Sequence, residues 1–114
     1  MSISRIDKSP RLSLAVAHQG TVYLTGQVGE AGASAADQTR QILASIDTLL
    51  EKAGTDKSRL LQATIWLADI GDFAEMNSVW DTWIDPQNPP ARSTGRMDLL
   101  EPGHKLEITV VAAT

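Results

Sequence analysis

The stretch Lys105-Leu-Glu-Ile-Thr-Val-Val-Ala-Ala113 decides the fold, because it reads as a strand that is apolar on both faces. Alternate side chains of a strand point to opposite faces. One face carries Leu106, Ile108, Val110 and Ala112, and the other carries Glu107, Thr109, Val111 and Ala113. Both faces are therefore expected to be covered in the native protein.

A second stretch, 60–68, has the same character. Alternation places its side chains in two sets: Leu61, Ala63, Ile65 and Leu67 on one face, and Thr64, Trp66 and Ala68 on the other. Four further stretches are predicted as strands, namely 2–7, 14–18, 21–28 and 91–99. The second and third of these flank Gln19-Gly20 and are expected to form a hairpin.

Two stretches have the 3–4 residue spacing of amphipathic helices. The first is 34–52, with Ser34 and Asp37 resembling a capping arrangement and Gly54 as its stop. The second is 72–84, with Asp72 as its expected N-cap. The expected apolar positions are Ala36, Ile42, Leu43, Ile46, Leu49, Leu50 and Ala53 in the first helix, and Phe73, Met76, Val79, Trp80 and Trp83 in the second.

The order β-β-β-α-β-α-β-β predicts an α+β protein with a mixed sheet of five to six strands. Two helices can cover only one side of such a sheet. The other face must then be buried elsewhere, most simply against copies of the same chain. A chain of this size also buries only about 65% of its unfolded surface by itself. We therefore expect a homo-oligomer.

The 114 residues predict a single domain, 1–114, and exclude several kinds of chemistry. The chain has no cysteine and only two histidines, so thiolates, iron–sulfur clusters and a three-histidine metal site are excluded. No metal and no cofactor is expected. The net charge of −4 disfavours a nucleic-acid partner. Apolar runs are too short for a membrane partner, and the absence of a signal sequence predicts the cytoplasm.

Two charged residues are the first candidates for a functional site. Arg92 follows Pro89-Pro90-Ala91 at the entry to a strand, where it could hold a carboxylate in a bidentate fork or form a surface ion pair. Glu107 lies within the decisive strand, either at a solvated rim or in an oligomer cleft where it could activate water.

Gly26-Gln27 interrupts a β-rich run, which indicates either a plain bulge or a close backbone approach to a ligand. Thr25 would then supply a hydroxyl nearby. The remaining residues of interest have structural interpretations: Trp80 and Trp83 as packing residues, Trp66 on the second sheet face, His18 and His104 as solvated, and Asp69 and Asp72 as caps.

Five stretches carry a resemblance that extends, in order and spacing, over nearly the whole chain: Val22-Tyr-Leu-Thr-Gly-Gln27, 41–54, Asp72-Phe-Ala-Glu-Met-Asn77, Pro90-Ala-Arg-Ser93 and Leu106-Glu-Ile108. The sequence resembles the RidA/YjgF/YER057c family of imine/enamine deaminases. The most specific feature is Pro-Ala-Arg-Ser with a glutamate fifteen residues after the arginine.

The resemblance implies a chorismate-mutase-like α+β fold and a homotrimer with its sheets at the centre and its helices outside. It also implies sites in the clefts between subunits. Family members hydrolyse reactive 2-imino acids and enamines to 2-keto acids and ammonia, without a metal or an organic cofactor. A small carboxylate is thus the expected substrate.

The resemblance also assigns roles by position. Arg92 matches the arginine that clamps the substrate carboxylate, and Glu107 matches the glutamate that holds the attacking water. The positions expected to line the substrate pocket are Thr25, Gly26, Asn77 and Thr94.

Several positions depart from the family pattern. Arg11 or Leu12 stands where active members carry a tyrosine that reaches a neighbouring subunit, Thr94 replaces a cysteine, and Gly95-Arg96 replaces an apolar–polar pair. A second arginine, Arg11 or Arg96, would favour a dianionic substrate. The missing tyrosine leaves a non-catalytic binder of small carboxylates as the alternative. An endoribonuclease, claimed for some relatives, is disfavoured by the pI of about 5.0.

Overall fold

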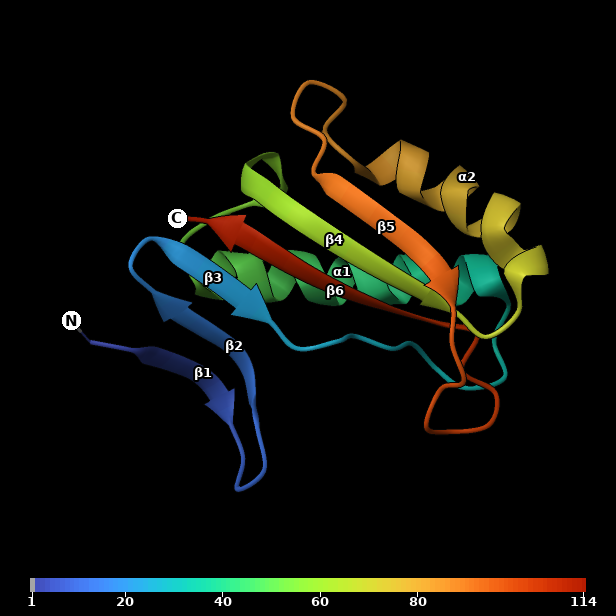
Figure 1. Ribbon diagram of the computed structural model, residues 1–114, viewed down its shortest axis with the longest axis horizontal. Coiled ribbons are helices and arrows are strands. Elements are labelled where there is room, and N and C mark those ends of the chain that lie inside the picture. Colours follow the sequence, from blue (N-terminus) through green and yellow to red (C-terminus); the bar gives the residue numbers. More distant parts are fainter. Residues whose placement is uncertain (1) are drawn as a thin grey trace.

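The computed structural model describes residues 2–114 as a six-stranded sheet with two helices. In chain order the elements are β1 (Ser4–Lys8), β2 (Ser13–His18), β3 (Thr21–Leu24), α1 (Ala35–Lys52), β4 (Leu60–Leu67), α2 (Phe73–Trp83), β5 (Ala91–Arg96) and β6 (Leu106–Ala113). The order of strands across the sheet is β1-β2-β3-β6-β4-β5 (Figure 1). Only β4 and β5 are parallel, and α2 is the crossover between them.

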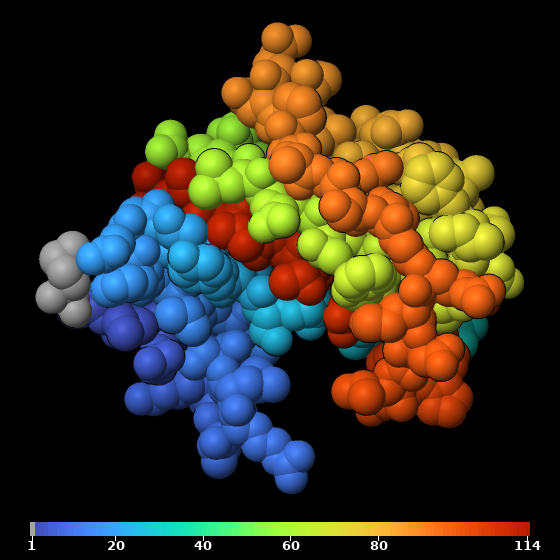
Figure 2. Space-filling view, in the orientation of Figure 1, coloured from blue at the N-terminus to red at the C-terminus, as the bar shows by residue number. Residues whose placement is uncertain are grey.

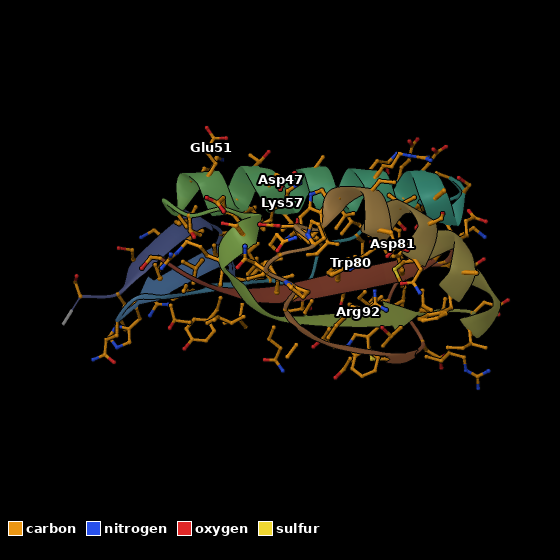
Figure 3. All side chains as sticks on the ribbon, turned by 90° about the horizontal axis from the view of Figure 1, so that it is seen from above. Asp47, Glu51, Lys57, Trp80, Asp81 and Arg92 are labelled. Atoms are coloured by element: carbon orange, nitrogen blue, oxygen red, sulfur yellow. The ribbon has the colours of Figure 1, made fainter. Side chains whose placement is uncertain are left out.

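Both helices lie on the same side of the sheet (Figure 3). The core fills the space between the two layers, where β6 contributes the side chains of Leu106, Ile108, Val110 and Ala112 and α1 contributes Ile42, Leu43, Ile46, Leu49 and Leu50. The predicted mixed sheet with helices on one face is confirmed. None of the helices within residues 2–114 is both long and apolar enough to cross a membrane.

The ends of α1 follow the sequence signals. The side chain of Ser34 accepts a hydrogen bond from the backbone N–H of Asp37 at 3.1 Å, and Gly54 adopts a φ of +81° just beyond the helix. The apolar stripe of α1 differs slightly from the prediction, because Ala35 is buried in place of Ala36.

At the start of α2, Asp72 occupies the N-cap position but makes no side-chain capping bond, so its predicted capping role is wrong. Asp69 does cap, accepting from the N–H of Gly71 at 2.8 Å. Phe73 is 38% exposed and not in the core as expected, because it stands at the helix end.

A carboxylate from α2 caps α1. Glu75 Oε2 accepts a hydrogen bond of 2.7 Å from the backbone N–H of Ala36, in the first turn of α1. A negative charge there also interacts favourably with the helix dipole. We expect Glu75→Ala to lower the free energy of unfolding by about 1 kcal/mol in urea titration at fixed protein concentration. Glu75→Gln keeps an acceptor and serves as control; equal stability of Glu75→Ala and the parent would contradict this cap.

Three strands differ from their predicted limits by two or more residues, whereas β2, β4 and β6 differ by a single residue. β1 begins and ends later than 2–7, β3 stops at Leu24, and β5 stops at Arg96. A bulge between Leu60 and Gln62 also reverses the expected phase at the start of β4, leaving Leu60 buried and Leu61 50% exposed. From Ala63 onward the predicted alternation holds.

Neither helix covers the second face of the sheet, because both lie on the other side (Figure 3). The centre of the second face carries Tyr23, Val111, Thr109 and Trp66, and Tyr23 is 51% exposed. Figure 2 views this face, with β6, β4 and β3 at the surface. The hairpin between β1 and β2 and the segment 97–104 project on either side of it. The predicted location of Trp66 on the second face is confirmed.

Candidate functional site

Arg92 lies at one edge of the sheet, under α2. It is paired in register with the fully buried Ala63, so its side chain points to the helix side of β5. Arg92 Nη1 donates a hydrogen bond of 2.8 Å to Asn77 Oδ1. The guanidinium carbon is 5.3 Å from the ring centre of Trp80 and 5.9 Å from that of Phe73 (Figure 3 labels Arg92 and Trp80).

These contacts orient the guanidinium without neutralising it. The ion pairs within residues 2–114 are Arg40–Asp37 and Lys52–Asp7, so no carboxylate pairs with Arg92. Within these residues Arg92 therefore does not form the ion pair of the alternative interpretation. Aromatic rings and one amide hold the plane of the group, and its remaining N–H donors are available to a planar anion such as a carboxylate.

Thr94 lies two residues further along β5, on the same side as Arg92. We call Arg92, Asn77 and Thr94 the arginine group. The support from Phe73 and Trp80 was not predicted, since both were assigned to packing alone. Their spacing with Asn77 along one side of α2 is the sequence signal that could have indicated it.

The loop before β5 is ordered by Asp85. Its carboxylate accepts from the side chain of Asn88 at 2.9 Å and from the backbone N–H of Gln87 at 3.0 Å. These hydrogen bonds hold the pKa of Asp85 below its usual value, and the bond from Asn88 has the larger effect. Pro89 and Pro90 then stiffen the entry to β5, so the chain reaches Arg92 along a restricted path.

Glu107 lies on the other face of the sheet. It follows the buried Leu106 and is paired in register with Trp66, so its half-buried side chain is on the open face. The carboxyl group lies directly against Gly26: a Cβ atom placed there would be 2.6 Å from Glu107 Cδ and 2.8 Å from Oε2. We call Glu107, Gly26 and Thr25 the glutamate group.

The chain at Gly26 is a break in strand pairing, as the sequence predicted. β3 ends at Leu24, and pairing with β6 resumes at Gln27, which exchanges both backbone hydrogen bonds with Ile108 at 2.9 and 3.1 Å. Thr25 is held by its N–H, which donates to the carbonyl of Leu14 at 2.9 Å. The break gives room for the Glu107 carboxyl group.

A methyl group at Gly26 should displace the glutamate without disrupting the fold. The atoms it would meet belong to the flexible end of Glu107, and the backbone of Gly26 is not in the left-handed region. For Gly26→Ala we expect about a tenfold fall in kcat/KM for the hydrolysis that the family resemblance implies, with a change in unfolding free energy of less than about 1 kcal/mol. Gly71→Ala is a control remote from the glutamate group; unchanged activity of Gly26→Ala would contradict a positioned Glu107.

One chain does not bring the candidate residues together. The arginine group is on the helix side of edge strand β5, the glutamate group is on the open face, and β4 separates β5 from β6. Arg11 and Leu12 are exposed at the tip of the β1–β2 hairpin, at the opposite end of the strand order from β5 (Figure 1).

The two histidines lie outside both groups. His18 Nδ1 is 3.2 Å from the carbonyl of Ser2, and His104 lies in the loop before β6. No group of three or more metal-binding side chains gathers in the part of the chain that the structure describes.

Comparison with known proteins identifies relatives of this chain. The family model described as endoribonuclease L-PSP matches residues 2–114. The RutC family protein YoaB of Escherichia coli is 47% identical over 113 residues, which are 99% of each chain. This chain belongs to the YjgF (Rid, RutC) family. The predicted resemblance is thereby confirmed.

Structures of Rid-family proteins agree. The structure of NMB1025 from Neisseria meningitidis, a YjgF family member, is 42% identical and superimposes with a TM-score of 0.97, covering 100% of this chain and 96% of that one. The 2-iminobutanoate/2-iminopropanoate deaminase of Bos taurus is 34% identical over 107 residues, 88% of this chain and 77% of the bovine protein. Deaminase activity is thus named in relatives about one-third identical, whereas YoaB carries only a family name.

Proposed function

We propose that this Rid-family protein hydrolyses 2-imino acids and their enamine tautomers to 2-keto acids and ammonia. The observation that carries the proposal is the guanidinium of Arg92, which donates to Asn77, lies 5.3 Å from the ring centre of Trp80 and pairs with no carboxylate within residues 2–114. A site with this donor geometry suits a small carboxylate. The named activity of the bovine relative supports the same chemistry.

The proposed reaction needs positioning and one proton acceptor. Arg92 binds the substrate carboxylate, which places the C=N carbon beside Glu107. Glu107 accepts a proton from a water molecule while the water oxygen adds to the C=N carbon. Glu107 then passes this proton to the imine nitrogen. The tetrahedral adduct breaks its C–N bond to release ammonia and the 2-keto acid. Addition of water to an imine is intrinsically easy, so orientation supplies most of the acceleration.

The site we propose lies between subunits of a homotrimer. Arg92 and Glu107 point to opposite sides of the sheet, so a substrate that touches both takes them from different chains. The uncovered face with Tyr23, Trp66 and Val111 supplies the surface for such an assembly. In this arrangement Thr25, Gly26, Asn77 and Thr94 line the cleft, and Arg11 or Leu12 reaches it from a neighbouring hairpin.

The test couples an amino-acid oxidase to the protein and follows the decay of the transient imine. We expect the protein to accelerate imine loss and ammonia release, and Arg92→Ala to lose that acceleration. The proposal is wrong if no imine decays faster with the protein than with Arg92→Ala. Light scattering tests the trimer separately, and a stable monomer would exclude the shared site.

The second candidate is a non-catalytic receptor for small carboxylates. The observation in its favour is the hairpin tip, where Ser9-Pro-Arg-Leu12 carries no aromatic hydroxyl. This alternative predicts calorimetric binding of 2-oxobutanoate that depends on Arg92, together with no acceleration of imine decay.

A further inference from the structure

Arg96 is a second arginine on the same side of β5 as Arg92. It is paired in register with the buried Leu67, just as Arg92 is paired with Ala63, so both point to the helix side of the sheet. Arg96 is exposed and ends the strand. Between the two arginines on this side lies only Thr94.

The two guanidinium groups can approach each other. Their Cα atoms are separated by four residues of extended chain, about 13 Å. α2 runs antiparallel to β5, so its Phe73 end lies toward Arg96 (Figure 1). The Arg92 guanidinium carbon lies 5.9 Å from the ring centre of Phe73, the residue at that end of α2. The long stem of Arg96 can cover much of the remaining distance.

No ion pair neutralises Arg96 in the part of the chain that the structure describes. Neither Arg92 nor Arg96 belongs to an ion pair within residues 2–114, and β5 itself contains no acidic residue. Asp98, two residues after Arg96, and Asp72, which precedes α2, form no ion pair with Arg96. Two arginines on one side of one strand, neither of them in an ion pair within residues 2–114, favour an anion with two charges.

We propose that Arg96 binds the second carboxylate of a dicarboxylic 2-imino acid whose first carboxylate is bound by Arg92. This inference rests on the proposed hydrolysis and specifies its substrate class. Imines of amino dicarboxylic acids, such as those formed by oxidation of aspartate or glutamate, are then the preferred substrates over imines of alanine or 2-aminobutanoate.

The experiment compares Arg96→Gln with the parent on both classes of imine, each generated by a suitable amino-acid oxidase. We expect kcat/KM on the dicarboxylic imine to fall about 10–100-fold, the range for losing a hydrogen bond to a charged group. On the monocarboxylic imine it should change less than about twofold. Arg59→Gln is the matched control, because Arg59 is also exposed but lies at the far end of β4 and donates to the carbonyl of Thr114.

A binding measurement separates this inference from the proposed function. Calorimetry with 2-oxoglutarate and 2-oxobutanoate should show tighter binding of the dicarboxylate by the parent but not by Arg96→Gln. If imines of both classes are hydrolysed and Arg96→Gln leaves their ratio unchanged, Arg96 serves only to keep the sheet edge charged and the inference is overturned. If no imine is hydrolysed, the proposed function fails, and the two keto acids alone decide the role of Arg96.

Discussion

Replacement of Arg92 by lysine is expected to lower kcat/KM for imine hydrolysis by about 100-fold or more, since a guanidinium and an ammonium are not interchangeable at a bidentate site. Lysine keeps the positive charge but loses the planar fork. It also loses the hydrogen bond to Asn77 and the stacking on Trp80. Because a misplaced carboxylate end shifts the C=N carbon away from the attacking water, kcat should fall together with the rise in KM.

Arg92→Ala should be at least as damaging, and Arg40→Lys is the matched control. Arg40 is an exposed arginine of α1 paired with Asp37, where a lysine can keep the ion pair. Thermal unfolding of each variant separates lost function from lost stability. If Arg92→Lys retained more than half of the parent kcat/KM, a bidentate carboxylate clamp would be excluded.

The local sequence identified Arg92 as a candidate residue but did not predict its surroundings. The prolines at 89 and 90 and the spacing to Glu107 identified Arg92 as a candidate from the sequence. Its direction depends on the parallel register between β4 and β5, which is a contact between strands separated by a helix. No local pattern specifies that register, so the stacking on Trp80 and Phe73 became visible only in the folded chain.

The strands also show which features the local sequence predicts and which depend on contacts between strands. Alternation predicted the buried side chains of β6 without error, because the irregularity in its pairing with β4 adds the extra residue to β4 and not to β6. At Leu60 and Leu61 it failed, because a bulge adds one residue on β4 and changes which side chain is buried. Gly26 was recognised as an interruption, but its contact with the Glu107 carboxyl group joins positions 81 residues apart.

Because Arg92 and Glu107 point in opposite directions, we expect a mixture of two inactive variants to regain activity. Arg92→Ala lacks the carboxylate clamp and Glu107→Gln lacks the proton acceptor, so each alone should be inactive. Arg92 points under α2 at the sheet edge, whereas Glu107 reaches away from β5 toward Gly26. A shared site therefore joins an intact Arg92 from one subunit to an intact Glu107 from the next.

Equal amounts of the two variants, unfolded and refolded together, should regain about a quarter of the parent activity, because in a cyclic trimer one site in four then combines the two intact residues. Each variant refolded alone, and a mixture made without unfolding, provide the baselines. If both residues of a site came from the same chain, every site in the mixture would keep one defect. The mixture would then stay as inactive as its components, and that result would overturn the intersubunit site while leaving the roles of Arg92 and Glu107 to the single variants.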